Sequence, residues 1–234
     1  MIKFYKVGGC VRDMILGVKS NDIDYTVTIK GDHSLEEGFE IMRNHLLGEG
    51  YEIFLENPEC VTIRAKKNKE VADFVLAREE LGYIQGTRKP IVRLGRLSHD
   101  LIRRDFTINA MAQDEDGNII DMFGGQEDLE NHILKTPLPA MQTFKDDPLR
   151  VLRAIRFAIR FDFCFSNEIK DAIRNPELPK LMKVVSKERI REELTKCFKC
   201  DTIKTLRLLN SIPHELLVSF FGGGLWLEPS LRKA

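Results

Sequence analysis

The sequence has no long hydrophobic run and no overall excess of either charge. None of its apolar stretches approaches the roughly 20 residues of a membrane-spanning helix, and its N-terminus lacks a signal-peptide pattern. We therefore expect a cytoplasmic protein with no membrane partner. The 36 Lys and Arg residues balance 36 Asp and Glu residues. The net charge by itself therefore gives no support to nucleic-acid binding.

Cysteine is also scarce. The chain has five cysteines, an odd number, and they are widely scattered. This distribution argues against a disulfide framework. Cys197 and Cys200 form a single C-x-x-C pair with no second pair and no histidine nearby, which favours packing over zinc binding.

What is present is the composition of an ordinary globular protein, with 43% hydrophobic and 31% charged residues in 234. This length allows one core, or a catalytic domain with a helical extension. The charge is unevenly distributed: residues 1–149 contain 19 Lys and Arg against 26 Asp and Glu, whereas residues 150–234 contain 17 against 10. An acidic first part and a basic, helical second part fit an enzyme that grips RNA with its second part.

Two adjacent glycines, Gly8 and Gly9, separate a short apolar run at residues 4–7 from a helical pattern. A strand, a glycine turn and a helix start leave free backbone N–H groups and a positive helix end, which suit a phosphate. Arg12, in the first helical turn, could add a second phosphate contact. The alternative is a simple turn.

Two aspartates, Asp22 and Asp24, open the following β-branched run. On a strand, residues i and i+2 point to the same face. Two adjacent carboxylates repel each other unless a cation lies between them, and Mg²⁺ is the usual one. A solvated loop is the alternative for the aspartates alone, but the glycine turn and the aspartates together, in this order, favour nucleotide chemistry.

This pairing resembles the nucleotidyltransferases related to DNA polymerase β. The longer string Gly-Gly-x-Val-Arg-Asp, then Leu-Gly, then Asp-x-Asp resembles the bacterial-type (class II) tRNA nucleotidyltransferase and poly(A) polymerase family. The resemblance implies an α+β fold in which a polymerase-β-like head, a mixed sheet with flanking helices, precedes an all-helical neck and body. We expect the head at residues 1–136 and the helical part at residues 137–234.

Further elements of a head follow. Residues 34–47 are expected to form an amphipathic helix capped by Ser34, and residues 51–55, 60–65 and 71–75 to form strands. Asp73 is a candidate third catalytic carboxylate, or an outward-facing polar residue. Residues 79–97 contain scattered glycines and arginines and are expected to form a loop. The resemblance implies a flexible loop there, involved in the switch from adding C to adding A.

Residues 101–111 are expected to place polar groups against an apolar helix face formed by Leu101, Phe106, Ile108 and Met111. An Arg-Asp pair alone would indicate a salt bridge, but Arg-Arg-Asp-Phe-Thr-Ile-Asn-Ala is a diagnostic string of the family. The resemblance implies that Arg104 contacts the nucleotide phosphates and that Asp105 and Asn109 lie near the ribose. The preceding His99-Asp100 is interpreted as the start of the helix.

A long helix is expected at residues 148–161, with Asp147 as N-cap and Pro148 as first residue. Its arginines at positions 150, 153, 156 and 160 could form a solvated face. The resemblance instead implies that Asp147 and Arg150 recognise the incoming base, with Arg153 adding a contact. On one edge, cytosine and adenine each present an acceptor that suits the Arg150 guanidinium and an amino donor that suits the Asp147 carboxylate. Uracil and guanine instead present an oxygen to the carboxylate.

Helices are expected at residues 167–175, 178–183, 187–200 and 202–210. Lys187, Arg189 and Arg191 either touch an RNA backbone or form a solvated face. Body and tail helices of typical relatives do not fit in the remaining residues, so we expect a compact version whose oligomeric state is open. The implied function is Mg²⁺-dependent addition of CMP and AMP, from CTP and ATP, to the 3′ end of tRNA. The alternatives are a poly(A) polymerase, an enzyme that adds only CC or only A, and a non-catalytic RNA-binding remnant.

Overall fold

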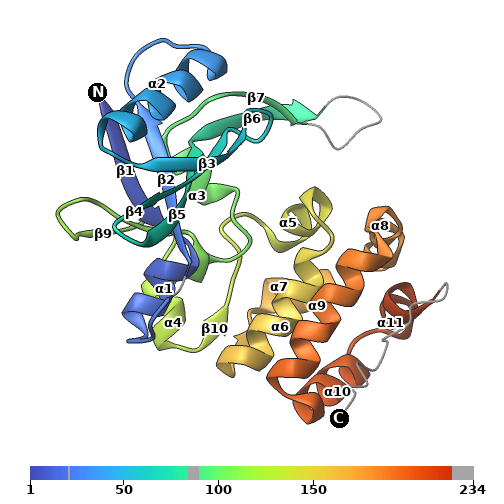
Figure 1. The fold of residues 1–234 in the computed structure, drawn as a ribbon. Coiled ribbons are helices and arrows are strands. Elements are labelled where there is room, and N and C mark those ends of the chain that lie inside the picture. The colour runs from blue at the N-terminus through green and yellow to red at the C-terminus, as the bar shows by residue number, and fades with distance from the viewer. Residues whose placement is uncertain (21, 84–89, 223–234) are drawn as a thin grey trace, which may run out of the picture. The chain divides into compact units, whose positions relative to one another are not determined.

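The computed structural model describes residues 1–20, 22–83 and 90–222, and the chain divides into two compact units, Met1–Gln126 and Glu127–Ala234 (Figure 1). Each unit has its own buried hydrophobic side chains. Among the described residues, no helix is both long and apolar enough to cross a membrane. The functional boundary expected after residue 136 stays a prediction.

The first unit is built on a mixed seven-stranded sheet in the order β3-β4-β5-β2-β1-β8-β9. Its strands are β1 (Ile2–Val7), β2 (Ile23–Ile29), β3 (Glu52–Asn57), β4 (Thr62–Lys67), β5 (Glu70–Leu76), β8 (Met111–Gln113) and β9 (Ile119–Asp121). All neighbouring strands are antiparallel except β2 and β5, which run parallel. This confirms the expected mixed sheet.

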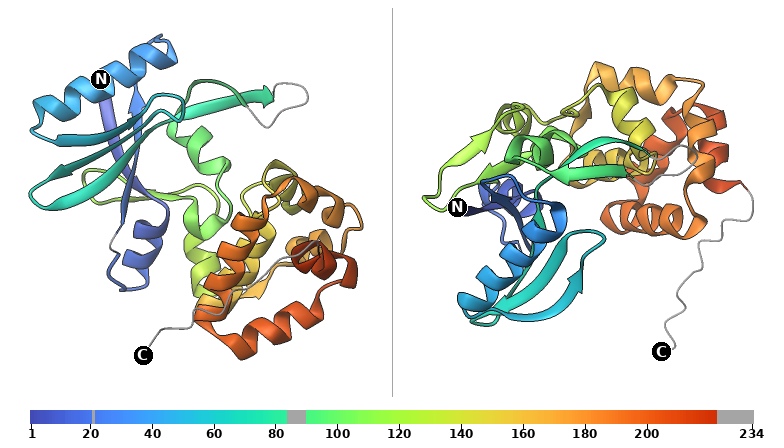
Figure 2. Two further views of the ribbon diagram at one scale, coloured as in Figure 1. Left: turned by 45° about the vertical axis from the view of Figure 1, so that its right-hand side comes forward. Right: turned by 90° about the horizontal axis from the view of Figure 1, so that it is seen from above.

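One face of the sheet is covered by helix α2 (Leu35–Gly48) (Figure 2). Its apolar positions, Phe39, Met42 and Leu46, are buried against inward-facing residues of β2, β4 and β5, and Met42 is fully buried. The capping box between Ser34 and Glu37 is present, as the sequence predicted. The strands expected between residues 51 and 75 are also present, with ends shifted by one or two residues.

The loop predicted for residues 79–97 is wrong for its described parts. Strands β6 (Arg78–Tyr83) and β7 (Pro90–Leu94) form an antiparallel hairpin, and residues 84–89 lie outside the described residues. The glycine and proline that suggested a loop occupy positions that a β-hairpin tolerates. The strand register shifts between Glu80 and Gly82, and Pro90 is the first residue of its strand, where a missing N–H does little harm.

Residues 101–111 also differ from the expected single helix. Helix α3 (Leu97–Ile102) ends early, a 3₁₀ turn covers Thr107–Asn109, and β8 begins at Met111. The expected apolar residues, Leu101, Phe106, Ile108 and Met111, are nevertheless all fully buried. Their burial was correctly inferred, but the chain buries them with three short elements in place of one helix. Two further helices are α1 (Gly9–Ile15) and α4 (Gly125–Glu130).

As far as the structure describes it, up to residue 222, the second unit is helical apart from one short parallel pair, β10 (Ile133–Leu134) with β11 (Cys164–Phe165). Its helices are α5 (Ala140–Asp146), α6 (Arg150–Phe161), α7 (Asn167–Arg174), α8 (Leu178–Leu181), α9 (Lys187–Cys200), α10 (Thr202–Ser211) and α11 (His214–Phe221). The helices expected at residues 167–175, 187–200 and 202–210 are confirmed, and the one expected at residues 178–183 is divided into α8 and a 3₁₀ turn at Met182–Val184. Helices α5 and α11 were not foreseen. Helix α6 packs against α9, with Ile155 and Leu194 fully buried. Cys197 of α9 is buried, with its Sγ 4.0 Å from the carbonyl oxygen of Leu152.

Candidate active site

The turn between β1 and α1 requires glycine at position 8. Gly8 has φ 75° and ψ −132°, a backbone conformation that side chains disfavour. A Cβ at Gly8 would also lie only 2.7 Å from Nη1 of Arg104. The backbone at Gly8 therefore approaches the guanidinium of Arg104 closely, and the predicted strand, glycine turn and helix are confirmed.

The three acidic residues singled out in the sequence influence one another. Asp24 in β2 pairs directly with Asp73 in the parallel strand β5, and Asp22 lies exposed just before β2. Burial raises the pKa of Asp24, and the neighbouring charges of Asp73 and Asp22 raise it further, while Arg104 acts in the opposite direction. The three carboxylates thus form a region of mutual repulsion next to an arginine.

Asp73 has a partner of its own. Nε and Nη2 of Arg64 in β4 each donate a hydrogen bond of 2.6 Å to the two carboxylate oxygens of Asp73. The hydrogen bond and charge of Asp73 raise the pKa of Arg64, to which Asp22 and Asp24 also contribute. Arg64 therefore supplies positive charge to the acidic cluster, a role that the sequence did not reveal.

The acidic cluster suits a hard divalent cation. Among the described residues, no three Asp, Glu, His or Cys side chains stand together as a ready-made set of metal ligands. Mg²⁺ commonly binds through one or two carboxylates together with substrate phosphates and water. The repulsion that raises the pKa of Asp24 is the charge imbalance that such an ion would relieve.

Arg104 is held by a buried carboxylate on α3. Asp100 is 1% exposed, and its Oδ2 accepts hydrogen bonds from Nη2 of Arg104 at 2.8 Å and from Oγ1 of Thr26 at 2.7 Å. Its Oδ1 accepts one from Arg103. Burial alone would raise the pKa of Asp100, but the two arginines and these hydrogen bonds lower it below its usual range. Asp100 is therefore an ionised anchor for Arg104.

A second network joins α1 to the 3₁₀ turn. Nη1 of Arg12 donates to Oδ1 of Asn109 at 2.6 Å, and Nε and Nη2 donate to Oδ1 of Asp13 at 2.8 and 2.6 Å. Nδ2 of Asn109 donates in turn to Oδ1 of Asp105 at 2.9 Å. Arg12, Asp105 and Asn109, which the sequence singled out separately, therefore lie in one buried network. In this arrangement the Arg12 side chain orients Asn109.

In the second unit, the predicted start of the long helix is two residues too early. Helix α6 begins at Arg150, and Asp147 follows the end of α5. Oδ1 of Asp147 still accepts a hydrogen bond from the Leu149 N–H at 3.3 Å, as a capping residue does. Its Oδ2 lies 3.3 Å from Nη2 of Arg189 in α9. The Asp147 carboxylate is thus fixed at both oxygens.

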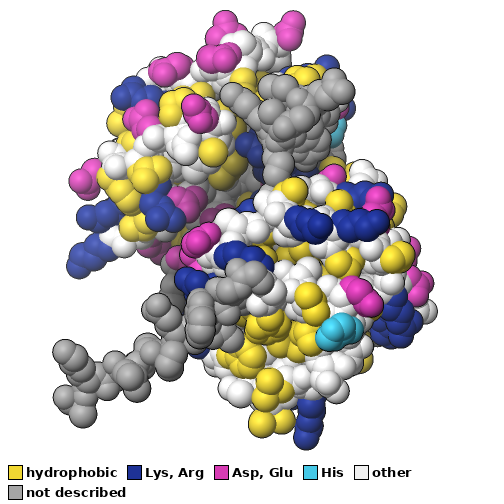
Figure 3. Space-filling model, turned by 90° about the vertical axis from the view of Figure 1, so that its right-hand side faces the viewer, with side chains coloured by type: hydrophobic (Ala, Val, Ile, Leu, Met, Phe, Trp, Pro, Cys, Tyr) yellow, Lys and Arg dark blue, Asp and Glu magenta, His cyan; other side chains and the backbone are white. Residues whose placement is uncertain are grey.

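The arginines of α6 have different environments. Nη1 of Arg150 donates to the Thr143 carbonyl at 3.5 Å, and the Arg153 guanidinium lies 5.6 Å from the centre of the Phe157 ring. Arg156 is buried, and its Nε donates to Glu193 in α9 at 2.7 Å. The four arginines are therefore not one solvated face. Figure 3 shows Lys and Arg side chains together with hydrophobic ones on the surface.

Sequence reasoning did not single out Arg64 and interpreted Asp100 only as part of the start of a helix. It expected Arg189 to touch an RNA backbone or to lie on a solvated face, and did not foresee its contact with Asp147. Arg64 and Asp73 face each other across the β4–β5 hairpin, and this could be inferred once the short turn fixed the register. Asp100 stands four residues before Arg104, a spacing typical of a helical ion pair. For Arg189 there is no local signal, because its contact with Asp147 depends on how α9 packs in the second unit.

Comparison with known proteins is consistent with this geometry. The model of the poly(A) polymerase head domain matches residues 4–135. A CCA-adding enzyme of Limosilactobacillus reuteri (strain DSM 20016) is 37% identical over 233 residues, which cover 98% of this chain and 52% of that protein. An A-adding tRNA nucleotidyltransferase of Aquifex aeolicus is 33% identical over 237 residues, covering 99% of this chain and 27% of that protein.

Solved structures agree. The CCA-adding enzyme of Bacillus stearothermophilus in complex with CTP has a TM-score of 0.73 at 28% identity, over 89% of this chain and 47% of that one. A tRNA nucleotidyltransferase complexed with a primer tRNA and an incoming ATP analogue has a TM-score of 0.72 at 29% identity, over 96% of this chain and 61% of that one. The chain thus spans about half the length, or less, of the curated relatives described above.

Proposed function

Because the chain belongs to the family defined by the poly(A) polymerase head domain, we propose that it adds CMP and AMP to the 3′ end of tRNA, using CTP and ATP and no nucleic-acid template. The observation that carries this proposal is the acidic cluster of Asp22, Asp24 and Asp73 beside Arg104. An arginine next to carboxylates that repel one another provides both contacts that a metal-bound triphosphate needs.

We assign metal binding to Asp22 and Asp24, and support in catalysis to Asp73. The oxygen ligands and the local negative charge fit Mg²⁺. When bound, Mg²⁺ lowers the pKa of the primer 3′-hydroxyl and stabilises the charge on the triphosphate. Arg64 limits the repulsion within the cluster by pairing with Asp73.

The phosphates of the incoming nucleotide are assigned to Arg104 and to the backbone at Gly8 and Gly9. Arg104 is supported by its buried partner Asp100, which leaves it oriented before substrate arrives. Asp105 and Asn109 are assigned to the ribose. Arg12 takes part through Asn109, and a direct phosphate contact would require Arg12 to leave its present partners.

Base selection is assigned to Asp147, Arg150 and Arg153. A carboxylate only accepts hydrogen bonds and a guanidinium only donates them, so the pair matches the amino group and ring nitrogen of cytosine or adenine. Uracil or guanine would place an oxygen against the Asp147 carboxylate. The fixed orientation of Asp147 between the Leu149 N–H and Arg189 supports this assignment.

A specific relative favours a second candidate. The A-adding tRNA nucleotidyltransferase of Aquifex aeolicus aligns with 99% of this chain at 33% identity. Addition of A alone is therefore the alternative. Purified protein, labelled nucleoside triphosphates, Mg²⁺ and tRNAs ending before, within or after CCA separate the two. Incorporation of C and then A supports the proposal, and incorporation of A only onto tRNA ending in CC supports the alternative. Continued A addition would indicate a poly(A) polymerase. Equal use of all four nucleotides would contradict the base assignment, and no incorporation would favour a non-catalytic RNA-binding protein.

A further inference from the structure

Three large apolar side chains lie exposed on neighbouring strands of the first unit. Phe54 and Leu55 in β3 and Val71 in β5 are 55%, 50% and 42% exposed. The register of β3 shifts between Ile53 and Leu55, so Phe54 and Leu55 together oppose one residue of β4, as in a β-bulge. Exposed apolar side chains that gather on one surface mark a binding site, whereas single ones are ordinary.

These side chains belong to the face of the sheet that carries the acidic cluster. Directly paired residues of neighbouring strands point to the same face. The opposite face is the one that α2 covers. A single row of cross-strand pairs on the open face runs from β1 to β3 and consists of Val7, Asp24, Asp73, Arg64 and Leu55.

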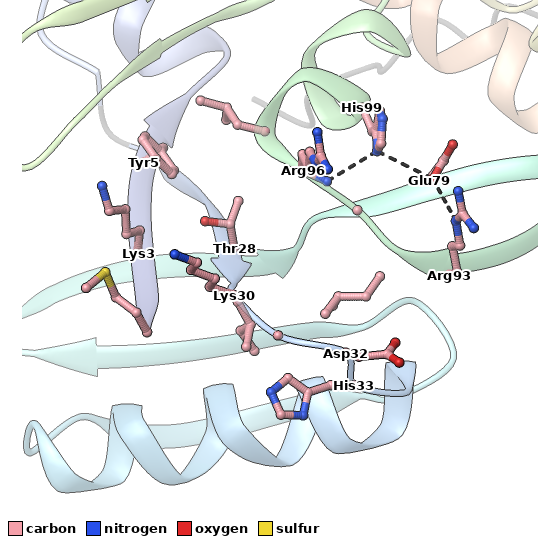
Figure 4. Close-up of a pocket in the computed structure, with 16 residues that line it drawn as sticks. Lys3, Tyr5, Thr28, Lys30, Asp32, His33, Glu79, Arg93, Arg96 and His99 are labelled. Carbon is pink, nitrogen blue, oxygen red and sulfur yellow. Dashed lines mark hydrogen bonds and ion pairs between the residues drawn. The ribbon is translucent and has the colours of Figure 1, made fainter.

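The β1 end of this row is occupied. Val7 packs with Leu97 of α3. A pocket of about 890 Å³ (Figure 4) is lined by β1, β2, the β6–β7 hairpin and the start of α3, and α3 separates it from Asp24. Arg104 and the backbone at Gly8, to which the triphosphate is assigned, also lie at this end. The side of Asp24 that faces β5 is therefore the one left for the second reactant.

The geometry of nucleotidyl transfer agrees with this placement. In an in-line displacement, the attacking oxygen and the leaving pyrophosphate lie on opposite sides of the phosphorus. With the triphosphate on the β1 side of Asp24, the attacking 3′-hydroxyl of the RNA lies on the β5 side, next to Asp73. Leu55 is two strands further along the row, roughly 10 Å away. This distance is comparable to the size of one nucleotide.

We propose that Phe54, Leu55 and Val71 bind the last nucleotide of the RNA primer, with its base packed on the two side chains of β3. Lys66, which is exposed in β4 and lies 3.9 Å from Glu52, is assigned to the phosphate of this nucleotide. Stacking on aromatic side chains tolerates every base, so the contact suits a primer whose last base changes during addition. This inference rests on the proposed function, because it takes the acidic cluster as the place of reaction.

The test removes the side chains and the base separately. Phe54→Ala/Leu55→Ala truncates the surface. Leu47→Ala is the control, because Leu47 is 45% exposed on α2, at the opposite face of the sheet. Each protein is titrated without nucleotide with a tRNA ending in CC and with the same tRNA whose last nucleotide is abasic. Loss of the base should weaken binding about tenfold for the unaltered protein and the control, and hardly at all for the double variant.

A second measurement uses the unaltered protein alone. A primer with 5-iodouridine as its last nucleotide is irradiated, and the cross-linked peptide is identified by mass spectrometry. Cross-linking within residues 52–57 is expected. Cross-linking only outside β3 and β5, or an equal effect of the abasic nucleotide on all three proteins, would overturn the proposal. A change from dimer to monomer in the double variant, with an unchanged effect of the abasic nucleotide, would overturn it too, because the surface would then join two copies of the chain.

Activity measurements separate this inference from the proposed function. If the proteins transfer nucleotides but the effect of the abasic nucleotide does not depend on Phe54 and Leu55, the inference fails while the function stands. If that dependence is found but no preparation transfers nucleotides, the function fails while the RNA contact stands. In an active preparation, the double variant should have a raised KM for tRNA and an unchanged KM for CTP. A raised KM for CTP alone would overturn the inference.

Discussion

At the scale of single residues, the candidate site depends on contacts that fix charged groups before any ligand arrives. Gly8 lets the backbone approach Arg104, and Asp100 holds the guanidinium in that position. An oriented charge needs no rearrangement during the reaction, which is why such contacts contribute to catalysis. The residues around Arg104 therefore give the sharpest tests at this scale.

Gly8→Ala is expected to lower nucleotide transfer by roughly 10²-fold, because the new methyl group would displace Arg104. The backbone strain should also destabilise the fold by roughly 1–3 kcal/mol. Steady-state kinetics with CTP and chemical denaturation measure the two effects.

The matched control is Gly17→Ala, since Gly17 also has a positive φ, 68°, but no atom lies within 4 Å of its Cβ position. This variant should be destabilised by its backbone strain, but it should transfer nucleotides at the rate of the unaltered protein. Equal losses of transfer in both variants would mean that strain, and not displacement of Arg104, is responsible.

Asp100→Asn is expected to destabilise the protein by about 3–5 kcal/mol at neutral pH, because it leaves two arginines beside a buried neutral side chain. The folded-state pKa of Asp100 is lowered from its ordinary value of 3.8. The stability that its charge contributes is therefore complete well above pH 3.8 and is lost as the pH falls below it.

Urea unfolding of both proteins between pH 7 and pH 2 measures this dependence. The difference in free energy of unfolding between Asp100→Asn and the unaltered protein should become smaller only at the acid end of this range. A difference that stays constant down to pH 2 would show that the Asp100 charge is not what the substitution removes. The exposed pair of Asp162 with Lys204 provides a control, since Asp162→Asn should change stability little.

At the scale of elements, the sequence predicts those that rely on local patterns. The capping box of α2, the β1–turn–α1 start and the helices between residues 167 and 211 follow from caps, glycines and periodicity. The β6–β7 hairpin was missed because glycines and prolines suggest a loop unless strand pairing is known. The pairs Asp73 with Arg64 and Asp147 with Arg189 were missed for the same reason, since each depends on the packing of two elements.

The contact between α9 and Asp147, which lies between α5 and α6, predicts a role for Arg189 in nucleotide choice. Arg189→Ala removes the partner of Asp147 Oδ2, so the carboxylate should lose part of its orientation. We expect preference for CTP over UTP to fall roughly tenfold, with the kcat for CTP nearly unchanged.

Competition between CTP and UTP on one tRNA measures this ratio, and Lys199→Ala, an exposed position on the same helix, is the control. A loss of kcat with unchanged preference would assign Arg189 to support of the fold. Rescue of the preference by Arg189→Lys would assign the effect to its positive charge.

At the scale of the whole molecule, the chain divides into two compact units, and each contains fully buried side chains. The first unit buries Met42 between α2 and the sheet, and the second buries Ile155 in α6. The assigned functions follow the same division, with carboxylates and Arg104 in the first unit and Asp147 with Arg150 in the second. Substitutions in each unit can therefore be compared for their effect on that unit.

Met42→Ala and Ile155→Ala each create a cavity at a fully buried position and should destabilise their own unit by about 2–5 kcal/mol. Hydrogen exchange measured along the chain should show lost protection mainly in the unit that carries the substitution. Equal loss of protection in both units from either substitution would show that the chain unfolds as one cooperative body.

The parallel pairing of β2 with β5 has a consequence for the order in which the acidic cluster is assembled during folding. Asp22 and Asp24 are made early, but Asp73 joins them only after α2 and the β3–β4 hairpin have been built and the chain has crossed back over the sheet. Such distant pairings form late, because a long loop must close first. The acidic cluster assigned above is therefore complete only when the sheet of the first unit has formed.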